Sequence, residues 1–251
     1  SPRRAMGQNF VVDPNTVRRV ARLARVGAGG HVVEIGAGLG SLTLALAETG
    51  ASVTAVELDR TLARVLDDLV ADLDVTVVCG DALELDWSKV VPAPPPWALV
   101  ANLPYNVATQ MVLGLLRDVP AIDPMLVMVQ REVGERLAAR PGDPAMGIPS
   151  VIVAYHGTAR VVGTVPASVF HPRPRVESVL VRIERHTTPA VDVPLALIDP
   201  LVRAAFGQRR KMIRRSLAGL RTSEQISEAG IDPTARPDTV TLGQWASLAR
   251  S

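Results

Sequence analysis

The chain has 251 residues, 47% of them hydrophobic, and a formal net charge of +2. This length and composition suit a soluble globular protein with one large domain and one small domain. The small net charge excludes overall charge as a source of nucleic-acid binding, so such binding must come from local basic clusters. Cys79 is the only cysteine, which excludes an internal disulfide and a thiolate metal cluster and indicates a reducing, cytoplasmic compartment.

Metal ions and membranes are not predicted partners. The four histidines lack the spacing of metal ligands. Residues 90–116 carry no charge and are long enough to raise the question of a membrane span, but prolines and asparagines interrupt them. We therefore expect a protein without a metal site and without a membrane-spanning segment.

The first predicted element is a helix over residues 14–25. Asp13 is a typical N-cap residue, and a proline suits the first helical position. Within this helix Arg18, Arg22 and Arg25 lie on related faces, because residues three or four apart are neighbours on a helix surface. The helix therefore carries a basic cluster near the start of the chain.

A buried strand is predicted over residues 32–35, followed by a glycine-rich turn and a helix that begins at Ser41. Glycines in such a turn allow positive φ and a close approach of the backbone to a ligand. The spacing is Gly-x-Gly-x-Gly, and Ser41 stands where the dinucleotide-binding fingerprint places its last glycine. This departure argues against a nicotinamide-dependent oxidoreductase.

Two further strands, over residues 52–56 and 75–78, lead into the acidic residues Glu57 and Asp81. Glu57 follows the first glycine of the turn by about 20 residues, from where a carboxylate can accept hydrogen bonds from both ribose hydroxyls. Asp81 can accept a hydrogen bond from an adenine amine, and its small neighbours leave space for the ring. The alternative is that such acids, Asp59 among them, cap the helices that follow them.

The most informative stretch is Asn102-Leu103-Pro104-Tyr105, which follows an apolar strand predicted over residues 97–101. An exocyclic adenine amine shares its lone pair with the ring, so a transferase must hold the amine hydrogens with acceptors. Asn102 and a carbonyl of the Leu103-Pro104 turn provide two acceptors, and Tyr105 offers an aromatic face for stacking. The alternative is that Asn102 caps a turn and Tyr105 fills a gap in the core.

Alternating strands and helices from residue 31 to about residue 140 predict an α/β fold with a mostly parallel sheet. A fifth strand is expected over residues 125–130, and segments 159–165 and 178–183 could pair antiparallel at the sheet edge. Ligands bind outside the carboxyl ends of parallel strands. The glycine turn, the two acids and the asparagine loop are therefore expected to line one crevice.

Residues 187–194 form a plausible linker, and the chain beyond it predicts a small all-α domain. Its helices are expected over residues 201–206, 210–218, 223–229 and 242–249. Between residues 203 and 221 the chain carries no acid and these basic residues: Arg203, Arg209, Arg210, Lys211, Arg214, Arg215 and Arg221. Such a segment can neutralise phosphates and position RNA, and the alternative is a solvated helix face.

The chain resembles the ribosomal RNA adenine N6-dimethyltransferase family, and within it the bacterial enzymes that act on small-subunit RNA. The matching motifs follow family order along nearly the whole chain, at residues 7–10, 33–38, 56–59, 80–82, 102–106, 170–178, 206–211 and 230–237. Ala37 stands where many relatives have proline, and Val11 where they often have leucine. Both changes conserve the small or apolar character that these positions need.

The resemblance implies a class I, Rossmann-like methyltransferase domain over residues 1–188 and a small helical RNA-binding domain over residues 195–251. It implies S-adenosyl-L-methionine as cofactor, held by Gln8, Asn9, Val11, Gly36, Gly38, Glu57, Asp81 and Asn102. The target adenine would be gripped by the catalytic residues Asn102, Leu103, Pro104 and Tyr105, with Phe170 as a second aromatic wall. The implied RNA contacts are Arg209, Arg210, Lys211 and Arg214.

The activity that the resemblance implies is N6,N6-dimethylation of two adjacent adenosines near the 3′ end of 16S ribosomal RNA, within the immature 30S subunit. The enzyme would act as a monomer and would bind no DNA. Two alternatives stay open. The first is a resistance-type methyltransferase that acts on large-subunit ribosomal RNA, against which the basic C-terminal signature argues. The second is an assembly factor whose RNA binding matters more than its catalysis.

Overall fold

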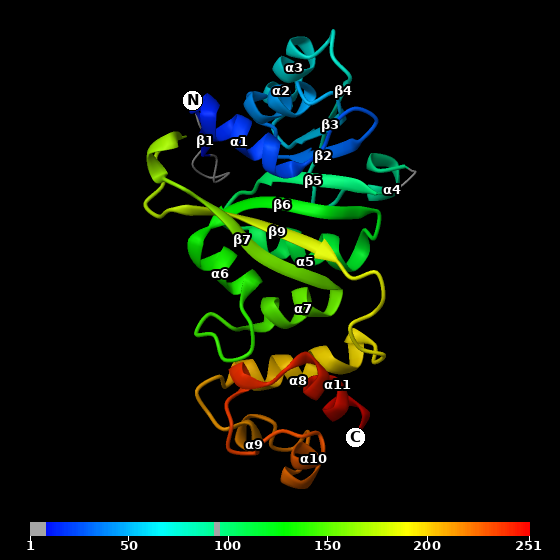
Figure 1. The fold of residues 1–251 in the computed structure, drawn as a ribbon, viewed down its shortest axis with the longest axis vertical. Helices are drawn as coiled ribbons and strands as arrows, with labels where there is room; N and C mark the ends of the chain where they lie inside the picture. The colour runs from blue at the N-terminus through cyan, green and yellow to red at the C-terminus, as the bar shows by residue number, and fades with distance from the viewer. Residues whose placement is uncertain (1–8, 93–95) are drawn as a thin grey trace. The chain divides into compact units, whose positions relative to one another are not determined.

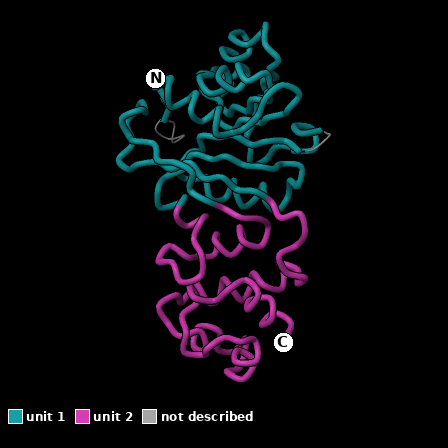
Figure 2. Tube along the Cα trace, viewed as in Figure 1, with its two compact units in different colours: residues 1–134, 160–184 teal, residues 135–159, 185–251 magenta. Residues whose placement is uncertain are grey.

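The computed structural model describes residues 9–92 and 96–251. The chain forms two compact units (Figure 2). The first unit comprises the chain up to Gly134 together with Arg160–Glu184, and the second comprises Glu135–Ala159 together with Arg185–Ser251. The chain therefore passes three times from one unit to the other.

A seven-stranded sheet organises the first unit, with the strand order β4-β3-β2-β5-β6-β9-β7 (Figure 1). The strands from β4 to β6 run parallel, and β9 lies antiparallel to β6. The strands are β2 (His31–Ile35), β3 (Ser52–Glu57), β4 (Val75–Cys79), β5 (Trp97–Asn102), β6 (Ile122–Gln130), β7 (Gly157–Val165) and β9 (Ser178–Arg185). This topology confirms the predicted α/β fold with a mostly parallel sheet and an antiparallel edge.

A second, two-stranded sheet pairs β1 (Phe10–Val11) antiparallel with β8 (Phe170–His171). A short 3-10 turn, η2 (Ala167–Val169), precedes β8. The pairing places Phe10 opposite His171 and Val11 opposite Phe170. It fixes the segment before the first helix against a segment that follows it by about 160 residues.

The helices of the first unit are α1 (Pro14–Ala24), α2 (Ser41–Ala47), α3 (Arg60–Leu69), α4 (Trp87–Val90) and α5 (Ala108–Asp118), and α6 (Arg131–Ala138) is shared between the units. Helix α1 begins as predicted, because Asp13 accepts a hydrogen bond from the Thr16 amide at 2.8 Å. Asp59 caps α3 in the same way and accepts from the Thr61 amide at 2.9 Å. The capping alternative is therefore correct for Asp59.

The core of the first unit consists of apolar strand residues that helices bury against the sheet. Val32, Val100 and Met128 project from neighbouring strands into one cluster, where Val17 and Val20 of α1 pack against them. Parallel strands of this kind read as continuous apolar runs, since both of their faces are buried. The core positions the loops at the carboxyl ends of the strands.

The second unit is helical and contains its own core. Its elements are α7 (Ile148–His156), α8 (Leu195–Gly207), α9 (Ile213–Ser216), α10 (Ser223–Glu228), η3 (Pro237–Thr239) and α11 (Leu242–Arg250). Trp245 is fully buried among side chains such as Ile198 and Leu217. In the ranges 9–92 and 96–251, no helix is both long enough and apolar enough to cross a bilayer.

Two C-terminal helices differ from their predicted bounds. Helix α8 begins at Leu195 rather than at residue 201, and Pro200 lies inside it. A proline inside a helix removes a backbone hydrogen bond, but Ile198 is buried in the core and holds the first turns helical. Helix α9 spans only Ile213–Ser216 instead of residues 210–218.

The compact units also divide the chain at other places than the predicted boundaries at residues 188 and 195. Helix α7 belongs to the second unit, because Val151 is buried in that core and Ile148 and Tyr155 pack against it. The stretch Glu135–Ala159 therefore joins the C-terminal helices. Sequence reasoning had assigned it to the methyltransferase domain.

Candidate active site

A cavity of about 260 Å³ lies at the carboxyl ends of the parallel strands in the first unit. It is lined by nine of the residues predicted from the sequence, namely Asn9, Gly36, Gly38, Glu57, Asp81, Asn102, Leu103, Pro104 and Tyr105. Four strands end at this edge in register, since Ile35 pairs with both Val56 and Ala101 and Glu57 pairs with Cys79. Parallel pairing thus brings distant stretches of sequence to one site.

The glycine turn after β2 needs glycines for two different reasons. Gly36 and Gly38 have φ angles of +77° and +58°, in the left-handed region that residues with a Cβ adopt at a cost. A Cβ at Gly38 would also lie 2.8 Å from the ring of Phe10. The Phe10 ring therefore lies directly against this turn, and it lines the cavity as well.

Glu57 is buried and held in a fixed orientation at the cavity wall. One carboxylate oxygen accepts a hydrogen bond from the Gly38 amide at 2.7 Å, and the other accepts from the Asp59 amide at 2.8 Å. A carboxylate has about four lone-pair positions, so each oxygen can accept one more hydrogen bond. Glu57 can therefore receive two hydroxyl donors of a ligand without moving.

Asp81 follows β4 and borders the cavity from the next loop. Its Oδ1 accepts a hydrogen bond from the Leu83 amide at 2.9 Å. The Gly80 amide donates to the Glu57 carbonyl at 3.0 Å, which ties the loops after β3 and β4 together. Asp81 thus combines a role in its own turn with a position at the cavity.

The asparagine loop is anchored at its start. Asn102 Nδ2 donates to the Asn9 carbonyl at 2.8 Å, and the Leu103 amide donates to the Met128 carbonyl of β6 at 3.1 Å. The Pro104 carbonyl accepts from two amides at the start of α5, from Val107 at 3.2 Å and from Ala108 at 3.0 Å. Asn102 Oδ1 and the Leu103 carbonyl are therefore the acceptors that this loop offers to a ligand.

Tyr105 is half-buried and contributes its ring to the cavity wall. Its hydroxyl lies 2.8 Å from the hydroxyl of Ser178, the first residue of β9. Partial burial raises the pKa of the Tyr105 hydroxyl, and the Ser178 hydrogen bond opposes that shift. Tyr105 thus remains a neutral aromatic side chain at neutral pH.

Glu34 is a buried acid that the sequence analysis placed in a strand and did not count as a site residue. It lines a smaller hollow that shares Phe10, Gly36 and Asn102 with the cavity. Burial raises the pKa of Glu34 to about 7, a hydrogen bond from the Thr43 hydroxyl opposes the shift, and the nearby Glu57 adds to it. The Thr43 oxygen lies 2.6 Å from Glu34 Oε2. The site therefore has beside it a third carboxyl group, whose charge changes near neutral pH.

Of the residues predicted to hold the cofactor or the target base, Val11 and Phe170 do not line the cavity. Gln8 lies outside the described residues. Val11 points away from the cavity wall that Phe10 forms, because successive residues of a strand face opposite sides, and it packs against the core. Phe170 pairs with Val11 and is buried in the same core. The pairing of β1 with β8 thus places Phe170 inside the unit, where it does not line the cavity.

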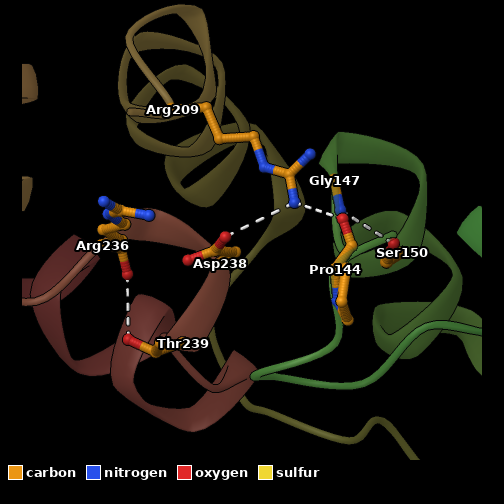
Figure 3. A network of polar contacts seen from close by, with 7 residues as sticks. All are labelled: Pro144, Gly147, Ser150, Arg209, Arg236, Asp238 and Thr239. Carbon is orange, nitrogen blue, oxygen red and sulfur yellow. Dashed lines mark hydrogen bonds and ion pairs between the residues drawn. The ribbon is translucent and has the colours of Figure 1, made fainter. Parts of the chain in front are cut away.

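Arg209, one of the predicted RNA contacts, interacts with two other segments of the second unit (Figure 3). Its guanidinium donates to the Pro144 carbonyl at 2.5 Å and lies 3.4 Å from Asp238 Oδ2. The Gly142 amide donates to the Asp238 carbonyl at 2.8 Å, so the same two segments are joined by the backbone as well. Arg209 therefore holds the loop before α7 against η3.

The other predicted RNA contacts, Arg210, Lys211 and Arg214, are exposed. Lys211 Nζ donates to Gln208 Oε1 at 2.7 Å, and the Arg214 guanidinium lies 3.6 Å from the Met212 sulfur. Both contacts are local and leave the charges at the surface. Arg210, Lys211 and Arg214 are therefore exposed cations of the second unit.

Residues at or beside the site that the sequence analysis did not name as site residues include Phe10, Glu34 and Ser178, although each lies within a motif of the resemblance. Phe10 follows Asn9, Glu34 precedes the glycine turn, and Ser178 ends the motif at residues 170–178. Together with the predicted residues they form a site with acceptors for ribose hydroxyls, acceptors for amine hydrogens and an aromatic wall. This set suits a nucleoside-bearing cofactor beside a flat base.

The chain matches proteins of known class over its full length. The profile of the family described as Ribosomal RNA adenine dimethylase matches residues 1–251. Two relatives, from Bifidobacterium longum and Cutibacterium acnes, are 46% and 47% identical to this chain. Both are named ribosomal RNA small subunit methyltransferase A. Each comparison covers 100% of this chain and 88% of the relative.

Solved structures show the same architecture. The crystal structure of the 23S rRNA methyltransferase ErmE is 27% identical, with a TM-score of 0.75 over 96% of this chain and 98% of that one. A dimethyladenosine transferase from Plasmodium falciparum is 20% identical and supports the fold alone, with a TM-score of 0.81 over 95% of both chains. On the strength of the family profile and the two bacterial relatives, the chain belongs to the ribosomal RNA adenine dimethylase family.

Proposed function

We propose that this protein transfers methyl groups from S-adenosyl-L-methionine to the N6 atoms of two adjacent adenosines near the 3′ end of small-subunit ribosomal RNA. The observation that carries the proposal is the cavity to which three segments contribute Glu57, Asp81, Asn102 and Tyr105. The two acids suit hydroxyl and amine donors, and the asparagine loop suits a flat base that carries an amine.

The residues at the cavity fit the cofactor by their chemistry. S-adenosyl-L-methionine supplies a methyl group that its sulfonium centre activates. Glu57 keeps a lone pair on each oxygen for a ribose hydroxyl, because each oxygen accepts only one backbone hydrogen bond. Asp81 is placed to accept from the adenine amine of the cofactor, and the Glu34 carboxyl in the adjacent hollow favours a cationic ligand when it is ionised.

The asparagine loop would hold the target base. Asn102 Oδ1 and the Leu103 carbonyl accept the two amine hydrogens, which returns the lone pair to nitrogen, and Tyr105 stacks on the ring. Orientation is then the main catalytic contribution. The proton leaves to water, because Glu57 and Asp81 face the hydroxyl and amine donors of the cofactor and no histidine is among the described residues that line the cavity.

The proposed substrate is 16S ribosomal RNA within the immature 30S subunit, bound by a monomer. The names of the two bacterial relatives support small-subunit ribosomal RNA as the substrate. The exposed Arg210, Lys211 and Arg214 would neutralise phosphates and position the RNA without reading its sequence. Such contacts predict binding that weakens steeply with salt.

The experiment is a methylation assay with purified subunits. The protein is incubated with S-adenosyl-L-methionine and undermethylated small subunits, and in parallel with large subunits, and the digested RNA is analysed by mass spectrometry for N6,N6-dimethyladenosine. Product in small-subunit RNA alone is the expected result. Binding of small subunits without any product would instead identify an assembly factor.

The likeness to ErmE supports a second candidate, a methyltransferase that acts on large-subunit RNA. The C-terminal sequence favours the first candidate, because the motifs at residues 206–211 and 230–237 resemble those of the small-subunit enzymes. Dimethyladenosine in large-subunit RNA alone would reverse this preference. The two parallel incubations therefore distinguish the candidates directly.

A further inference from the structure

Ser178 carries a buried hydroxyl at the start of β9, directly before an apolar run. It is fully buried, and the next three residues of β9, Val179, Leu180 and Val181, are buried as well. A hydroxyl that leaves water without a hydrogen-bond partner destabilises the fold. The Ser178 hydroxyl has the Tyr105 hydroxyl as its partner, and the two oxygens lie 2.8 Å apart. The two residues are 73 positions apart in the sequence.

The Ser178 side of this contact is rigid. Ser178 pairs with Gln130 in the antiparallel ladder between β9 and β6. The carbonyl of the preceding residue, Glu177, accepts a hydrogen bond from the Arg131 amide at 3.0 Å. The Glu177 carboxylate also forms an ion pair with the Arg131 guanidinium at 2.6 Å. The backbone that carries the Ser178 hydroxyl is therefore fixed relative to the sheet.

The Tyr105 side lies in a turn whose backbone is anchored on both sides. The Leu103 amide is bound to β6, and the Pro104 carbonyl is bound to the first turn of α5. Between these anchors the half-buried ring can rotate about its two side-chain torsions. Because the hydroxyl stands at the far end of the ring, a hydrogen bond there restrains both torsions at once.

We infer that Ser178 is a positioning residue, which holds the Tyr105 ring in place as the stacking wall for the target adenine. The inference rests on the proposed function. Ser178 does not line the cavity itself, and so it acts through Tyr105. Its contribution is to the orientation of the base in each of the two methyl transfers.

The test compares Ser178→Ala, Tyr105→Phe and the double variant. Tyr155→Phe is the control, because it removes a tyrosine hydroxyl at another place in the chain. The chain has two tyrosines, so tyrosine labelled with carbon-13 at Cζ gives one resonance for the contact and one internal reference. At saturating RNA we expect kcat to fall about two- to tenfold in Ser178→Ala and Tyr105→Phe alike, the range of one neutral hydrogen bond. The double variant should fall no further, cofactor affinity should stay unchanged, and Ser178→Thr should retain activity.

A merely structural role gives a different pattern. If Ser178→Ala lowers thermal stability but leaves kcat and the Tyr105 resonance unchanged, or if the two losses multiply in the double variant, the inference is wrong. Should Ser178→Ala fail to fold, Tyr105→Phe carries the same test, because it keeps Ser178 and removes only the partner hydroxyl. A wild-type protein without methylation activity would instead refute the proposed function.

Discussion

Replacing Glu34 with glutamine should change how the stability of the protein depends on pH. Glu34 is 1% exposed, and burial raises its pKa from the ordinary value of 4.5 to about 7. Between these values the folded protein binds a proton that the unfolded chain does not bind, so the free energy of unfolding falls as the pH rises and then levels off above pH 7. A difference of about 2.5 units corresponds to about 3 kcal/mol.

Glu34→Gln removes this titration and keeps an oxygen that can accept the hydrogen bond from Thr43. We therefore expect the loss of stability between pH 4.5 and pH 8 to be smaller in the variant than in wild type by about 3 kcal/mol. Urea unfolding followed by tryptophan fluorescence measures this, since Trp87 and Trp97 both lie in the first unit.

The exposed Glu84→Gln is the matched control, because it removes the same charge from the surface. Its stability should follow the wild-type pH profile. Parallel profiles for wild type and Glu34→Gln would refute the reasoning, since they would mean that Glu34 has the same proton affinity in the folded and unfolded states.

Three further predictions concern activity and packing. Asn102→Ala should abolish methylation and should lower cofactor affinity less than Glu57→Ala does. The methylation assay measures the activity, and isothermal titration measures the cofactor affinity. Equal activity in Asn102→Ala and wild type would contradict the role given to the Asn102 amide. Arg209→Ala should lower the melting temperature, because it removes the contacts to the loop before α7 and to η3, whereas Arg210→Ala should leave the melting temperature unchanged and weaken RNA binding at low salt. Gly134→Ala should cost about 1–3 kcal/mol of stability in urea unfolding, because its Cβ would lie 2.2 Å from a methyl carbon of Val179.

Local sequence signals were sufficient to predict the end of a helix where a single capping residue determines it. Asp13 caps α1 through an amide three residues away, and a short-range interaction of this kind is visible in the sequence. The start of α8 was missed because Pro200 is a strong local signal for a break. Burial of Ile198 in a core built from distant helices outweighs that signal, and no window of local sequence contains those helices.

The same division applies to the site. Glu57, Asp81 and Asn102 were found because each follows a recognisable strand, and parallel pairing then brings the strand ends together. Ser178 was missed because its meaning depends on a partner 73 residues away. Arg209 belonged to a run without acids in the sequence, yet the acid that it approaches, Asp238, lies 29 residues further on.

The three passages of the chain between the units have a practical consequence for dissecting this protein. A cut within residues 187–194 would leave α7 on the N-terminal fragment, while most of the core that buries Val151 would go with the C-terminal fragment. Cleavage of that backbone segment would therefore not yield two self-sufficient pieces. The nicked halves should stay associated in a native gel and separate only in denaturant, and an N-terminal fragment expressed alone should aggregate through the bared face of α7.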